Sequence, residues 1–153
     1  MKITKKHQQG DLLLIKIQSL PDGEIKILSK SRLVLAHGES GHSHVVEESD
    51  AELIQIGERI LMRLENANQK GNLTGCKLFS ENETQFVCDT PTLGRVAFSK
   101  SDAEFSKGTV KIGKFGLLKH EEHFNQAVTE GIWEIGRVME YDWFSQMARQ
   151  VMD

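Results

Sequence analysis

The stretch DLLLIKIQSLPDGEIKIL, residues Asp11–Leu28, decides the fold class. Its two halves are rich in leucine and isoleucine and carry few charges, which is typical of strands that line a protein core. Between the halves stands Pro21–Gly23, and Pro-Asp-Gly is a turn signal because proline presets φ and glycine accepts a positive φ. The pattern predicts a β-hairpin at the start of a mainly β protein.

Further short strands are predicted along most of the chain. Arg32–Gly38 is apolar, and His42–Glu48 (HSHVVEE) alternates so that His42, His44 and Val46 share one face of a strand. The same kinds of pattern predict strands at 95–99, 108–113 and 130–142.

The segment 50–68 fits two interpretations. A capping box of Ser49 and Glu52, followed by apolar residues at helical spacing, is typical of a helix. Alternatively, Leu53–Ile56 and Ile60–Leu64 are two short strands joined at a Gly-Glu turn. We favour the two strands because the neighbouring segments are β.

A second hairpin is predicted over Gly75–Asp89, with its tip at Glu81–Glu83 and Cys76 facing Cys88. The facing thiols could form a reduced core contact, a cross-strand disulfide or two soft metal ligands. We prefer the core contact, because two cysteines are too few for a disulfide framework and cytosolic thiols stay reduced.

The last residues, Asp142–Asp153 (DWFSQMARQVMD), predict a short amphipathic α-helix with Asp142 as its N-cap. The expected fold is therefore a single antiparallel β-barrel or rolled sheet with a short C-terminal α-helix. Its 153 residues fit one domain, spanning 1–153, because no linker or repeat divides them.

Composition excludes some classes of function. The formal net charge of −3 is spread along the chain, so nucleic acid is disfavoured as a partner. We expect a cytoplasmic protein without membrane contact, because no apolar run approaches the roughly 20 residues of a membrane span and no signal peptide is evident. A small molecule or a protein is the expected partner, and the sequence leaves a homo-oligomer open.

Four of the six histidines form two tight pairs, His42 with His44 and His120 with His123. Residues two apart on a strand project from one face, so His42 and His44 could hold one ion together. His120 and His123 would share a face only if the backbone bends between them. The clustering predicts a metal site with these four histidines as ligands, completed by a carboxylate from Glu48, Glu121 or Glu122.

Imidazole ligands select a divalent transition metal, zinc first and iron, manganese or nickel next, over calcium or magnesium. In a catalytic site the ion would activate a water molecule while Glu39 or Glu121 accepts the proton. We therefore expect a metal-dependent hydrolase. The alternative is a non-catalytic binding or accessory protein with a structural cluster of histidine and glutamate.

The spacing HxHxxxE, formed by His42, His44 and Glu48, resembles part of the first metal motif of cupins. Cupins are small β-barrels whose metal ligands point into the barrel. The resemblance implies a cupin-like barrel here.

A broader resemblance joins QGDLLLIKIQSLP, AHGESGHSH, LLKHEEHF and EGIWEIGRVMEYDWF, in that order. The chain looks like a family of small uncharacterised proteins of bacteria and their phages, in which QGD, GHxH, HEEH and EYD elements recur. The resemblance implies no reaction, but it implies a shared site at His42, His44, His120, Glu121, Glu122 and His123. It leaves out about 69–114, which we expect to be an inserted excursion, and it favours strands over Leu53–Leu64.

Overall fold

The regular structure of this protein is β throughout the described residues. The computed structural model describes residues 6–9, 12–37, 43–69, 71–120 and 123–137. The strands in these ranges are β1 (Lys6–Gln9), β2 (Leu12–Ile17), β3 (Lys26–His37), β4 (Ser43–Ile56), β5 (Arg59–Leu64), β6 (Lys77–Glu81), β7 (Gln85–Thr90), β8 (Gly94–Ser99), β9 (Glu104–Ser106), β10 (Thr109–Lys111), β11 (Phe115–His120), β12 (His123–Thr129) and β13 (Gly131–Arg137).

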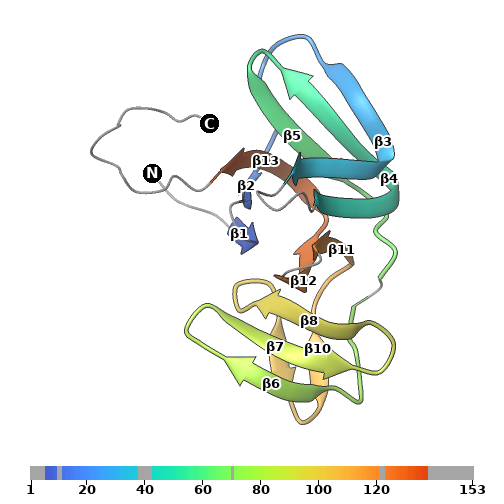
Figure 1. Cartoon of the computed structure of the whole chain (residues 1–153), viewed down its shortest axis with the longest axis vertical. Coiled ribbons are helices and arrows are strands. Elements are labelled where there is room, and N and C mark those ends of the chain that lie inside the picture. Colours follow the sequence, from blue (N-terminus) through green and yellow to red (C-terminus); the bar gives the residue numbers. More distant parts are fainter. Residues whose placement is uncertain (1–5, 10–11, 38–42, 70, 121–122, 138–153) are drawn as a thin grey trace.

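One curled sheet contains eleven of these strands, in the order β1-β2-β13-β5-β4-β11-β12-β8-β7-β6, with β3 paired to β4 beside this path. Neighbours are antiparallel except β12 and β8, which share a short parallel contact. In Figure 1, β3, β4 and β5 lie at the top, β6, β7, β8 and β10 at the bottom, and the strands that join them lie between. β9 and β10 form a separate two-stranded ribbon.

The first seven strands of the path form a roll, because β1 comes round to contact β12. Trp133 is fully buried inside it and donates its indole N–H to the carbonyl of Thr129, at 2.9 Å. The predicted rolled sheet is confirmed. The other fully or almost fully buried members of its core include Leu12, Leu14, Leu33, Val46, Met62, Leu64, Leu118 and Val128.

The strand interpretation of 50–68 is confirmed, and the helical one is wrong. β4 runs to Ile56, Gly57 and Glu58 form the turn, and β5 follows. Gly57 adopts a φ of 61°, which a tight two-residue turn requires. Cross-strand pairs such as Leu53 with Met62 outweigh the helical spacing, because they bury both faces of the ribbon against other strands.

The predicted hairpin around Pro21–Gly23 is wrong. β2 pairs with β1 on one side and β13 on the other, so neither of its edges is left for β3. β3 pairs with β4 instead. The chain does bend at Asp22 and Gly23, and Gly23 has a φ of +134°, but β13 occupies the edge of β2 that a hairpin strand would have filled.

Residues 69–114, the predicted excursion, contain β6 to β10 and contribute most of a second core. Its neck is closed by Gln69 and Phe115, which exchange two backbone hydrogen bonds of 3.1 and 3.0 Å. This second core includes Phe86, Cys88, Val96, Phe98, Val110 and Ile112, together with Phe115 and Ala127 from β11 and β12.

The predicted hairpin over Gly75–Asp89 is present, but its register differs. Glu81 pairs with Phe86, so the tip lies further along the chain than predicted. Leu78 therefore pairs with Cys88, and Cys76 precedes the first paired residue, Lys77. Both thiols are free and buried in the second core. Burial raises both thiol pKa values, that of Cys88 to about 11, which keeps the thiols protonated and poorly suited to bind metal.

The fold-class prediction requires a correction, because it included a short C-terminal α-helix and the described residues contain no helix. Asp142–Asp153, where that helix was predicted, lies outside the described residues. A twelve-residue amphipathic pattern is weak grounds for a helix, since helices this short are marginal unless a neighbouring apolar face covers them. Within the described ranges, no helix is long and apolar enough to cross a membrane.

The close approach of two backbone segments near the neck of the excursion can be tested by comparing substitutions at Gly71 and at Gly57. Gly71 has a φ of +88°, and a Cβ there would lie 2.0 Å from the carbonyl oxygen of Ile112, whereas a Cβ on Gly57 would meet nothing within 4 Å. We expect Gly57→Ala to cost about 1 kcal/mol, the conformational term alone. Gly71→Ala should cost more than about 3 kcal/mol, because backbone must also move. Urea unfolding of both variants measures this difference, and equal losses would contradict the close approach.

Candidate histidine site

Three imidazoles lie in a row across three neighbouring strands. Leu118 pairs with Val46, and Lys119 with Val45, so continuing the ladder between β11 and β4 by one pair brings His120 beside His44. His120 in turn pairs with His123 across β11 and β12. Strand pairing therefore brings together two histidine segments that are distant in the chain.

The rings of this row lie close together and differ in exposure. The ring centroids of His44 and His120 are 4.2 Å apart and stacked at 29°. Those of His120 and His123 are 4.8 Å apart, and those of His44 and His123 are 6.4 Å apart. His44 is buried at 1% exposure and His120 at 8%, while His123 is exposed, so the row leads from the interior to the surface.

The buried side chain of Gln9, at the end of β1, orients the innermost ring. Its amide nitrogen donates to the carbonyl oxygens of Leu118 and Phe124, at 3.1 and 2.8 Å. Because carbonyl oxygens only accept, the amide oxygen must face His44 Nδ1, which lies 2.8 Å away. Nδ1 of His44 therefore carries a proton, and Nε2 is the acceptor of the neutral ring.

Register shifts interrupt the ladders on both sides of the row. One falls between Leu118 and His120 on β11, opposite β12. The other falls between Val34 and Ala36 on β3, where Ala36 pairs with His44. Such irregularities free backbone groups and turn side chains. The carbonyl oxygens that Gln9 satisfies belong to the first of these irregular segments.

Glu48 projects from the same face of β4 as His44, but it lies about 13 Å further along the strand. Its carboxylate accepts a hydrogen bond of 2.6 Å from the backbone N–H of Asn68 and packs against Gly116. Burial raises the pKa of this carboxyl, and the Asn68 bond and the charge of Lys119 partly offset that rise. Glu48 therefore holds the start of the excursion and is remote from the histidine row.

Of the predicted site residues, His44, His120 and His123 are brought together. His42, Glu39, Glu121 and Glu122 lie outside the described residues. Among the residues described, no three His, Cys, Asp or Glu side chains form a ready set of metal ligands.

Gln9 was missed as a site residue in the sequence analysis. Its one signal would be that it begins the QGD element, whose recurrence in related chains stays a prediction.

Comparison with known proteins gives one match. Residues 8–75 match the family model of a domain of unknown function (DUF8820). The match includes Gln9, His44 and Glu48, and it ends before β6. No curated protein and no solved structure matches the chain. The likeness to an uncharacterised family is thus supported over this range, while the bacterial and phage origin and the recurring elements stay predictions.

The Gln9 network can be tested by unfolding. We expect Gln9→Ala to lower the free energy of unfolding by about 2–4 kcal/mol, because it leaves two carbonyl oxygens and one ring N–H without their partner. Gln55→Ala is the matched control, since that amide makes one exposed bond, to the carbonyl of Gly57, and should cost less than about 0.5 kcal/mol. Similar losses in both variants would show that Gln9 does not hold the sheet together.

Glu48 should make stability depend on pH. Because the folded-state pKa is raised above 4.5, the folded protein binds more protons than the unfolded chain between the two pKa values. Stability relative to Glu48→Gln should therefore fall as the pH rises through that window. Urea midpoints between about pH 4 and pH 7 measure it. Glu47→Gln, which removes a carboxylate exposed on the same strand, controls for net charge, and a constant difference for Glu48→Gln would refute the raised pKa.

Proposed function

We propose that this protein is a metal-binding β domain in which His44, His120 and His123 hold a divalent transition-metal ion. The observation that carries the proposal is the row of three imidazoles from three adjacent strands, with the inner ring oriented by Gln9. Metal-binding histidines usually donate their second ring N–H to a carbonyl or carboxylate oxygen, and the Gln9 amide oxygen supplies the same kind of acceptor.

Three imidazoles are the type of ligand that a divalent transition-metal ion prefers. Neutral imidazoles suit zinc first, and also iron, nickel or manganese. The ring of His44 is stacked with those of His120 and His123, so ligation requires the rings to turn until their nitrogens face one ion. His123 is exposed, and His44, whose Nδ1 donates to Gln9, would ligate through Nε2.

More specifically, we propose that the metal-binding domain is a hydrolase. A bound ion would supply Lewis acidity, and the chain would have to supply a proton acceptor. Glu39 and Glu121 are the predicted acceptors, one on each histidine segment. A small molecule or a protein would be the partner. A reducing cytoplasmic location fits the two buried free thiols, Cys76 and Cys88.

A structural network without a metal is the second candidate, and one observation favours it. The amide of Gln9 already joins β1 to β11 and β12, and it holds a histidine that is almost fully buried. In that case the row would fix the roll, and the protein would be a non-catalytic binding or accessory domain.

Zinc binding to tag-free protein separates the candidates. We expect about one zinc ion per chain by elemental analysis after dialysis, and a rise in Tm on zinc addition. His123→Ala should abolish both effects with little change in the stability of the metal-free protein, because its side chain is exposed. Gln55→Ala, which removes only an exposed amide bonded to the carbonyl of Gly57, should keep both.

Two results would contradict metal binding. If the protein takes up no zinc, or if His123→Ala binds as well as the unchanged chain, the metal proposal is wrong. A large loss of stability in Gln9→Ala together with no zinc uptake would establish the structural network instead.

A further inference from the structure

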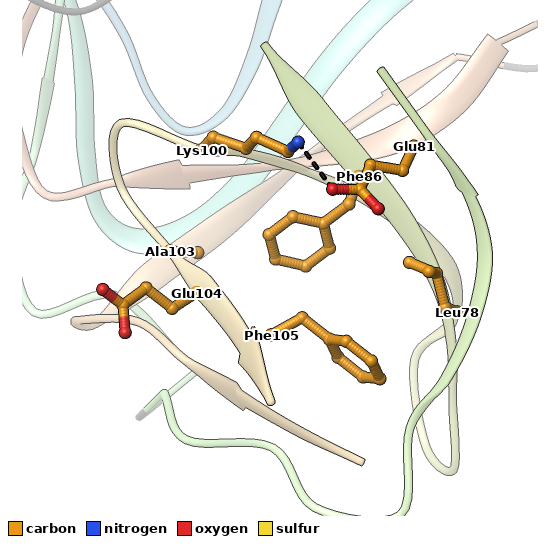
Figure 2. A pocket seen from close by; sticks show the side chains of 7 residues that line it. All are labelled: Leu78, Glu81, Phe86, Lys100, Ala103, Glu104 and Phe105. Atoms are coloured by element: carbon orange, nitrogen blue, oxygen red, sulfur yellow. Dashed lines mark hydrogen bonds and ion pairs between the residues drawn. The ribbon is translucent and has the colours of Figure 1, made fainter. Parts of the chain in front are cut away.

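The excursion contains a pocket that the histidine site does not use. It has a volume of about 350 Å³ and opens between the β6–β7 hairpin and β9 (Figure 2). Its size is within the range of small-molecule sites. Its floor is apolar: Phe86 and Ala103 are buried, and Leu78 and Phe105 form two walls.

Aromatic faces dominate the interior of the pocket. The rings of Phe86 and Phe105 are 6.1 Å apart and inclined at 48°, so they form two sides of a wedge. Leu78 is 46% exposed although it borders this apolar space. An apolar group in the wedge would cover Leu78 and the partly exposed ring of Phe105, and would gain the free energy of their burial.

Two of the charged residues that border the pocket, Lys100 and Glu81, form an ion pair. Lys100 Nζ lies 2.6 Å from Glu81 Oε2, and Figure 2 shows this pair beside the ring of Phe86. Both side chains are partly exposed, at 35% and 50%. Exposed ion pairs contribute little net stability, so this pair can open at small cost. The carboxylate of Glu104, which also borders the pocket, points away from the rings in Figure 2.

We propose that this pocket binds a free apolar α-amino acid. The carboxylate of the ligand would pair with Lys100, its ammonium group with Glu81, and its side chain would enter the wedge of Phe86 and Phe105. Adjacent opposite charges match a zwitterion, because each ion of the opened pair receives a new partner. A ligand with one charge would leave one of the two ions unpaired.

Three ligands of nearly equal size test the proposal directly. L-phenylalanine carries both charges, phenethylamine only the ammonium group, and 3-phenylpropionate only the carboxylate. We expect L-phenylalanine to shift the amide resonances of residues 78–105 in NMR titrations, with each analogue binding on the order of tenfold more weakly.

Single substitutions test each proposed contact between the pocket and the ligand. Lys100→Gln and Glu81→Gln should each weaken L-phenylalanine binding on the order of tenfold and should remove its advantage over the analogue that lacks the charge in question. Phe105→Ala should abolish binding. Phe124→Ala is the control, because that ring is 43% exposed and lies outside the pocket. Thermal unfolding checks that each variant is folded.

Two results would overturn the inference. If an analogue binds as tightly as L-phenylalanine, the pocket does not recognise a zwitterion. If none of the three ligands shifts the pocket resonances at millimolar concentration, the pocket is not a site for this class of ligand.

Discussion

Among the described residues, the side-chain amide of Gln9 links the two ends of the roll. β1 and β12 come into contact, but no backbone ladder joins them. Gln9 makes the connection instead, with two bonds to carbonyl oxygens of β11 and β12 and a third to His44 on β4. Buried carbonyl oxygens without a donor would each cost free energy comparable to a lost hydrogen bond. The same amide therefore satisfies irregular backbone, holds the strands together and fixes the tautomer of the inner histidine.

β11 and β12 serve both cores, and this explains where the histidine row lies. Leu118 and Val128 face the roll, whereas Phe115 and Ala127 face the core of the excursion. Two backbone N–H groups at the entry to the excursion, those of Ala67 and Asn68, are held by the carboxylates of Glu130 and Glu48. β11 and β12 are packed in both cores, and His120 and His123 lie at the end of β11 and the start of β12, where the ladder becomes irregular.

Alternation and apolar content were sufficient to predict most strands, because a strand's burial pattern is local. Strand pairing joins residues that are far apart in the chain, and the wrong predictions of partner and register follow from that. β13 lies more than a hundred residues beyond β2 yet occupies the edge that β3 was expected to fill. The tip of the second hairpin lies beyond Glu81, which pairs with Phe86, so Leu78 rather than Cys76 faces Cys88. His44, His120 and His123 could be grouped from their residue type alone. Gln9 could not, because its partners are 35 to 115 residues away and a glutamine has no signature of its own.

The two candidate sites belong to different cores and share no side chain. The histidine row is set by β4, β11, β12 and Gln9, while the pocket is built from β6, β7, β9 and the turn between β8 and β9. Groups that are well separated and have no common partner contribute to stability almost independently. Coupling between the sites would have to pass through β11 and β12, whose opposite faces pack in both cores. Because close-packed strands move as units rather than residue by residue, a change in the row would reach the excursion only by shifting these two strands together.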